Sequence, residues 1–229
     1  MRSKGCRAVA KTTCALLLLV AATWTSRAAE RTDAVSVADN ALLKTIFDAD
    51  QMDRTGGNIA REPVAVLCRD RQRRDVALEQ IKAGRLQTAS DYFHAAMVLQ
   101  HSLEDIRLAH ALSTIAAVLD PDKMQYRWLT AASWDRLLVQ HAQPQWYGTQ
   151  YHSDEHGMFL YPVAQGAVSD AERRRMGAPP LAEAEEMVRK IPAMEGREPR
   201  KVPPPTLAQL QARGRPTPPE LPADACKEK

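Results

Sequence analysis

The sequence predicts a mainly α-helical chain built of antiparallel helical hairpins, with an irregular loop lobe that carries a short β-hairpin. Three observations support this fold class. Apolar residues recur with helical spacing through most of residues 33–191, the connections between the central helices are very short, and proline and glycine interrupt the pattern after His141. Hydrophobic residues make up 45% and charged residues 26% of the 229 residues, which is ordinary for a chain that buries a core.

The first 28 residues have the pattern of a secretory signal peptide. They contain five basic and no acidic residues, an apolar stretch over 14–22, and small residues at Ser26 and Ala28. The alternative, a membrane anchor, is less favoured because the apolar stretch is about half of the roughly 20 residues that a spanning helix needs. We therefore expect cleavage after Ala28 and a periplasmic or secreted product that is not attached to a membrane.

Removal of this segment changes the charge of the chain. The full sequence has 31 basic and 28 acidic residues, whereas residues 29–229 have 26 basic and 28 acidic residues. A slightly acidic mature chain argues against a nucleic-acid partner. The charge-rich run at 69–75 interleaves both signs, so we expect a solvated helix face there.

Two helices are expected before Gly84. The first covers 38–54 and places apolar residues such as Leu43 and Ile46 on one face. Pro63 is suited to the first turn of the second helix, and Gly84 is suited to its end.

Three further helices are expected over 90–101, 103–119 and 123–141. Capping boxes are indicated at 88–91 and 102–105, and a break followed by a cap at 120–122. Alanine-rich faces on all three helices allow the backbones to approach closely, as in tetratricopeptide or Sel-one-like helical hairpins. Such repeats are about 34–40 residues long, and no unit of that length recurs in this sequence. We therefore expect only the tetratricopeptide-like style of helix packing.

The helical pattern ends after His141. Pro144 and Gly148 exclude a regular helix over 143–150, and residues 150–153 and 158–161 are predicted to form the arms of a hairpin. A Ser-x-x-Glu capping box at 169–172 starts another helix, and one more follows Pro180.

The last 38 residues, from Pro192, contain nine of the fifteen prolines and are expected to form a disordered tail. Two cysteines, Cys68 and Cys226, remain after signal cleavage. Because Cys226 lies in that tail, free thiols are favoured over a disulfide between them.

Aromatic residues concentrate beside the irregular loop. Eight of the twelve lie between 126 and 161; Trp128 and Trp134 are suited to packing, whereas Trp146 and Tyr147 are candidate ligand contacts. Asp135 lies on the apolar stripe of its helix and is predicted to point inward, where an unpaired charge costs several kcal/mol. Its partner is expected to be His101 or the backbone amides near Gly148, in a structural network or a ligand site.

Histidines give weaker signals. His94 and His101 are seven residues apart, which is too far for a helical zinc pair, and His101 is more typical of a satisfied helix end than of a general base. The side chains of 152–156 suit a metal, but they fall in a turn, so we expect no metal and no cofactor. Common catalytic motifs are absent from the sequence.

Five short elements together resemble a bacterial family known as a domain of unknown function. They are Asp50-Gln-Met-Asp-Arg54, Ala95-Ala-Met-Val-Leu-Gln-His101, Trp134-Asp-Arg136, Gln143-Pro-Gln-Trp-Tyr-Gly-Thr-Gln150 and Arg175-Met-Gly-Ala-Pro-Pro-Leu181. The resemblance spans about 40–185 and implies that the polar residues of these elements meet in space. Ala142 stands where the family pattern has glycine, which puts the turn that ends the preceding helix in question.

These observations lead to three functional hypotheses. The first is an exported helical binding module that holds a small polar ligand or a peptide in a cleft formed by His101, Asp135, Arg136 and the 145–150 loop. The second is a hydrolase in which His101 is a general base oriented by Asp135, with Arg136 or Thr149 stabilising negative charge. The third is a structural scaffold with a buried polar network. The candidate ligand-binding residues are Gln100, Arg136, Gln145, Trp146, Tyr147, Thr149 and Gln150.

Overall fold

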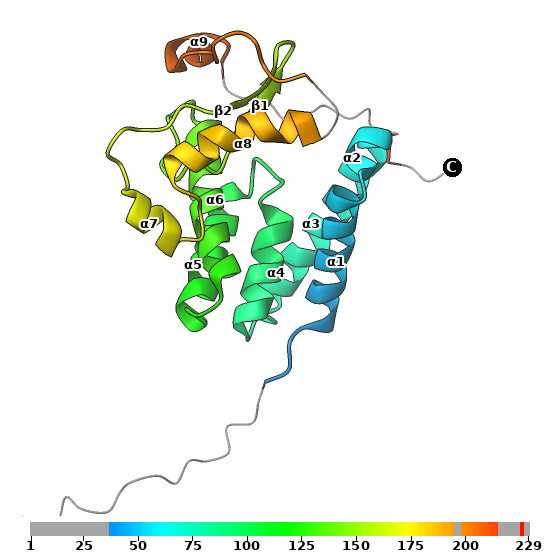
Figure 1. Ribbon diagram of the computed structural model, residues 1–229. Coiled ribbons are helices and arrows are strands. Elements are labelled where there is room, and N and C mark those ends of the chain that lie inside the picture. Colours follow the sequence, from blue (N-terminus) through cyan, green and yellow to red (C-terminus); the bar gives the residue numbers. More distant parts are fainter. Residues whose placement is uncertain (1–36, 195–197, 215–224, 227–229) are drawn as a thin grey trace, which may run out of the picture. The chain divides into compact units, whose positions relative to one another are not determined.

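The computed structural model describes residues 37–194, 198–214 and 225–226, and it is mainly helical with one small antiparallel sheet, as expected (Figure 1). The predicted signal peptide lies outside the described residues. The first six helices are α1 (Ala41–Thr55), α2 (Asn58–Arg61), α3 (Pro63–Lys82), α4 (Ala89–Leu99), α5 (Ile106–Leu119) and α6 (Met124–Gln140). No helix in the described ranges is long and apolar enough to cross a bilayer.

Helices α4, α5 and α6 pack as consecutive neighbours around the core, with α1 and α3 on the α4 side (Figure 1). Alanines lie at the helix contacts: Ala95, Ala96, Ala109 and Ala116 are fully buried. Their small side chains let the helix axes come close, and larger buried residues such as Leu129 fill the remaining space. The predicted hairpin packing of small faces is therefore confirmed.

The starts of α1 and α4 are joined through their caps. The side chain of Asn40 accepts hydrogen bonds from the first turn of α1, and Thr88 and Asp91 form the predicted capping box of α4. Asp91 also accepts a bond of 2.7 Å from the Asn40 backbone N–H. One buried carboxylate thus fixes both helix starts.

Two predicted caps were wrong. Helix α5 begins at Ile106, and neither Ser102 nor Asp105 caps it with a side chain, because the Asp105 carboxylate is bonded to Arg74 of α3. Helix α6 is preceded by Lys123, also without a side-chain cap, so the acids at 120–122 do not form one.

Helix α6 ends with a residue in the left-handed region at Ala142, whose φ is 53°. The Gln143 N–H bonds to the Leu138 carbonyl and the Ala142 N–H to the Val139 carbonyl, which is the Schellman arrangement. The turn that glycine usually makes is therefore formed here by alanine.

The irregular lobe follows this turn. Strands β1 (Tyr151–Asp154) and β2 (Gly157–Leu160) pair antiparallel, one residue away from the predicted arms. Helices α7 (Asp170–Arg175) and α8 (Leu181–Met194) come next, and Ser169 caps α7 as predicted. Pro192 lies inside α8, so this helix continues into the segment expected to be a tail.

Part of the proline-rich segment has a defined structure, contrary to the prediction. Thr206 and Gln209 form a capping box at the start of α9 (Leu207–Ala212). The Arg200 guanidinium bonds to Asp154 at 2.5 Å and lies over the Phe159 ring, 5.3 Å from its centroid. These local and long-range contacts offset the entropy cost of ordering this part of the chain. From composition alone, that cost was expected to keep the segment disordered.

The preference for free thiols was also wrong. Cys68 of α3 and Cys226 form a disulfide across a sequence separation of 158. The sequence does not show which part of the core a remote segment contacts, so it gave no reason to pair them.

Candidate functional site

Asp135 is fully buried and is held by the loop that follows α6. Its two carboxylate oxygens accept bonds from the backbone N–H groups of Trp146, Tyr147 and Thr149 at 2.7–3.1 Å. The Thr149 hydroxyl adds a fourth donor at 2.9 Å. Burial raises the pKa of Asp135, and these donors act against that rise. Of the two partners considered from the sequence, the loop amides are the ones found.

Two glutamines close the same loop on itself. The buried Gln145 amide donates to the Gln150 and Tyr161 carbonyls and accepts from the Gln150 N–H, while the Gln150 amide reaches the Ala132 carbonyl on α6. Gly148 has a φ of 80° and is buried, as the loop requires. The polar groups of Gln145, Thr149 and Gln150 therefore bond within the protein.

The loop aromatics have different surroundings. Trp146 is 36% exposed and packs edge-on against Trp134, with ring centroids 5.2 Å apart. Tyr147 is partly buried, and burial raises the pKa of its hydroxyl. The exposed edge of Trp146 is thus the part of this loop that is most open to a ligand.

His101 does not contact Asp135 through any hydrogen bond or ion pair among the described residues. Its Nε2 lies 3.4 Å from the Asp50 carboxylate of α1. Gln100 is buried, with its amide donating to the Met97 sulfur. The structure therefore separates the predicted polar set in two: Asp135 belongs with the 145–150 loop, and His101 belongs with α1.

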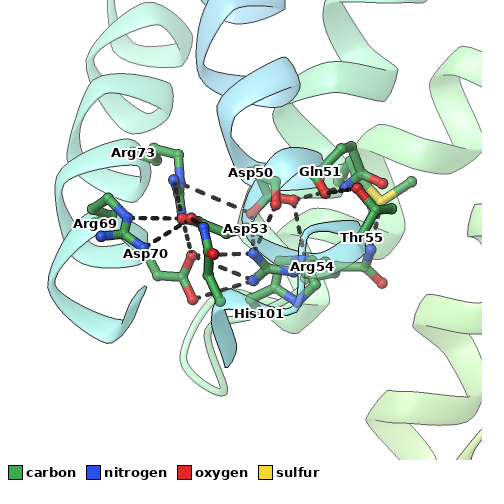
Figure 2. Close-up of polar contacts among 12 residues, drawn as sticks. Asp50, Gln51, Asp53, Arg54, Thr55, Arg69, Asp70, Arg73 and His101 are labelled. Atoms are coloured by element: carbon green, nitrogen blue, oxygen red, sulfur yellow. Dashed lines mark hydrogen bonds and ion pairs between the residues drawn. The ribbon is translucent and has the colours of Figure 1, made fainter. Parts of the chain in front are cut away.

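Asp50 is part of an ion-pair network between α1 and α3 (Figure 2). The Arg54 guanidinium lies 2.8 Å from Asp50 and 3.2 Å from Asp70, so it connects these two acids. The Arg73 guanidinium lies 2.6 Å from Asp70 and 2.8 Å from Asp53, and it connects that pair in the same way. Arg69 completes the network with two bonds to Asp53, at 2.8 and 2.9 Å.

Several members of this network are buried, although the sequence indicated a solvated face. The side chain of Arg73 is 7% exposed and that of Asp50 is 1% exposed. The Arg69 guanidinium holds the pKa of Asp53 well below its usual range. The i, i+3 and i, i+4 spacing of acids and arginines was visible in the sequence, but it does not show that another helix covers that face.

The network carries one more negative than positive charge when His101 is neutral. Three guanidinium groups (Arg54, Arg69, Arg73) face four carboxylates (Asp50, Asp53, Asp70 and Glu62), the last of which lies 3.5 Å from Arg69. Burial lowers the pKa of His101, the Asp50 carboxylate acts against that fall, and Arg54 and Arg136 reinforce it. A neutral imidazole is able to accept a proton or a hydrogen bond.

A cavity of about 420 Å³ lies beside this network, and we call it the α3 cavity. Its apolar wall consists of Leu67, Val98 and Leu103. The polar wall consists of Asp70, Arg71, Arg74, Asp75, His101, Ser102 and Glu104. His101 and Asp70 belong to both the cavity wall and the network, so the network positions two groups that a ligand would meet.

The other histidines that the sequence drew attention to lie elsewhere. His152 packs against Phe159 and Tyr161, and His94 packs against Phe47, so burial lowers the pKa of both imidazoles. Asp154 is engaged by Arg200. In the part of the chain that the structure describes, no three His, Cys, Asp or Glu side chains are grouped in a way that would hold a metal ion.

Comparisons with protein-family models, with curated proteins and with solved structures gave no match. The resemblance to a bacterial domain of unknown function therefore stays a prediction, and the function has to be argued from the site itself.

Proposed function

We propose that the chain is a helical binding module for a small polar ligand or a short peptide, and that the ligand binds in the α3 cavity. The observation that carries this proposal is the wall of the cavity, which combines three apolar side chains with His101 and with charges of both signs. Its volume of about 420 Å³ is in the range of small-molecule sites.

The charges on the cavity wall favour a zwitterion, such as an amino acid or a dipeptide. Arg71 is exposed and has no ion pair within the described residues. Asp75 and Glu104 pair with Arg74 at 3.6 and 3.1 Å, but their side chains are 71% and 75% exposed, so their carboxylates remain accessible. A ligand carboxylate suits Arg71, a ligand amine suits the acids, and the neutral imidazole of His101 suits a backbone N–H or C=O group.

Thermal unfolding in the presence of leucine, dialanine and acetate tests this proposal. We expect leucine and dialanine to raise the midpoint more than acetate, because both are zwitterions whereas acetate carries only a negative charge. Arg71→Gln and His101→Ala should each remove the response, whereas Arg174→Gln, an exposed arginine on α7, should keep it. A response that survives Arg71→Gln, or no response of the wild type to any of the three compounds, would contradict the proposal.

The contact between His101 and Asp50 favours a second candidate, a hydrolase in which His101 is the general base. Asp50 then replaces Asp135 as the positioning carboxylate. Thr149 is engaged with Asp135, so it does not serve as an anion stabiliser in this version. Hydrolysis of small esters and dipeptides should be lost in His101→Ala, and its acid limb should lie below pH 6.5 because burial lowers the pKa of His101.

The scaffold hypothesis accounts best for the loop around Asp135, because its polar groups are satisfied internally. We propose this structural role for the 145–150 loop alone, next to a binding role for the α3 cavity.

We also propose that the protein is exported to the periplasm or secreted. The Cys68–Cys226 disulfide supports this proposal, since such bonds persist in oxidising compartments. N-terminal sequencing of the protein from its native host should find a first residue at Ala29, and an intact Met1 would contradict export.

A further inference from the structure

Two buried polar atoms on one face of α6 have no hydrogen-bond partner among the described residues. They are the Nε of Arg136 and the Oε1 of Gln140. The two residues are four apart, so they lie next to each other on the helix. Both side chains reach toward the connection between α4 and α5: Arg136 donates to the Gln100 carbonyl at 3.4 Å, and Gln140 donates to the Leu103 carbonyl at 2.7 Å.

The charge of Arg136 is not balanced by the groups around it. No ion pair joins it to a carboxylate in the described ranges, and its bond to Gln100 is long. Burial lowers the pKa of Arg136, and the nearby charge of Arg54 lowers it further. Arg54 already has Asp50 and Asp70 as partners, so it leaves no spare acid for Arg136. Because arginine stays protonated in proteins, a partly buried guanidinium needs a negative partner.

The two unpaired atoms also define the chemistry of a partner. The guanidinium donates to anion oxygens, whereas the amide oxygen of Gln140 needs a donor. We propose that Arg136 and Gln140 bind a small oxyanion that carries a hydroxyl group, as hydrogen phosphate does. This site does not depend on the function proposed for the α3 cavity, whose test uses zwitterions and Arg71.

Urea unfolding with inorganic phosphate, sulfate or chloride at constant ionic strength tests the site on the intact chain. At phosphate about tenfold above its Kd, we expect the unfolding equilibrium constant to fall about tenfold. Sulfate, which has no hydroxyl near neutral pH, should act more weakly, and chloride should act only through screening.

Gln140→Glu provides the sharpest variant, because it places a carboxylate one turn from Arg136 and keeps the size of the side chain. The new acid should pair with Arg136 and repel phosphate, so the phosphate response should be lost. The stability of Gln140→Glu without phosphate is not the readout, since this variant also loses the hydrogen bond to the Leu103 carbonyl. Gln125→Glu, at an exposed position of α6, adds the same charge to the same helix and should keep the response.

Arg136→Gln should also lose the response, and a folded Gln140→Glu keeps the test decisive if Arg136→Gln does not fold. The proposal is overturned if phosphate does not stabilise the wild type, if chloride has the same effect as phosphate, or if the phosphate response persists in Gln140→Glu.

Discussion

The buried carboxylate of Asp135 should be the main support of the 145–150 loop, and Asp135→Asn tests this. Asparagine keeps one acceptor oxygen and replaces the other with an NH₂ group. In one orientation of the amide, the NH₂ group would face the N–H donors of Trp146 and Tyr147. In the other orientation it would face the N–H and O–H donors of Thr149. At least one buried donor then loses its acceptor.

The expected magnitude follows from these bonds. Leaving a buried donor unsatisfied costs about 1–3 kcal/mol, and a hydrogen bond to a charged group contributes about 1.5–3 kcal/mol. We therefore expect Asp135→Asn to lower the free energy of unfolding by about 3–5 kcal/mol. In a chain of this length that corresponds to a midpoint lower by roughly 6–20 °C.

Urea unfolding followed by circular dichroism measures this change. Thr149→Val, which removes the hydroxyl that donates to Asp135 and accepts from the Gln150 amide, should lower the free energy of unfolding by about 1–2 kcal/mol. Asp122→Asn, at an exposed acid before α6, serves as the matched control and should stay within about 0.5 kcal/mol of the wild type. If Asp135→Asn behaves like Asp122→Asn, the carboxylate does not hold the loop and the reasoning is refuted.

Three further predictions concern the fold. Ala142→Gly should raise the free energy of unfolding by about 0.5–1 kcal/mol. The substitution removes about 1–2 kcal/mol of left-handed strain from the folded state, but the larger backbone entropy of glycine in the unfolded chain cancels part of this gain. A lower urea midpoint would contradict this expectation. Loss of the Cys68–Cys226 bond, by reduction or by a double serine variant, should lower that free energy by up to about 5 kcal/mol for the sequence separation of 158, and dithiothreitol should not affect the double variant. Burial lowers the pKa of four histidines, so the folded state binds protons less tightly than the unfolded chain, and the free energy of unfolding should fall as the pH drops below about 6.5. Urea unfolding at pH 5.5 and 7.5 measures whether the free energy of unfolding falls at the lower pH, and single glutamine variants of these histidines should reduce that fall. The four histidines are His94, His101, His110 and His152.

Features with a local cause could be predicted from the sequence. Helix periodicity, the capping box at Thr88 and the proline at the start of α3 depend on neighbours within one turn, and all three were found in the structure. The predicted box at Ser102 failed because a residue from another helix, Arg74, binds Asp105. A side chain with two available partners is assigned correctly only when the distant partner is known.

The same distinction applies to the candidate site. The inward direction of Asp135 followed from its place on an apolar stripe, and the loop amides were one of its two predicted partners. The contact between His101 and Asp50 joins residues 51 positions apart, and no periodicity in the sequence relates them. The α3 cavity likewise requires the α4–α5 connection to lie against α3, which is a property of the tertiary packing.

The Cys68–Cys226 bond turns most of the described chain into a covalent ring. Helices α4 to α9 and both strands lie between the two cysteines, whereas α1 and α2 lie outside them. A protease that cuts one loop inside the ring opens it without releasing a fragment, so both pieces stay joined until a thiol reductant is added. A cut on the α1 side of Cys68 has the opposite consequence: only noncovalent contacts, including the ion pairs that Asp50, Asp53 and Arg54 make with α3, would then retain the excised helix.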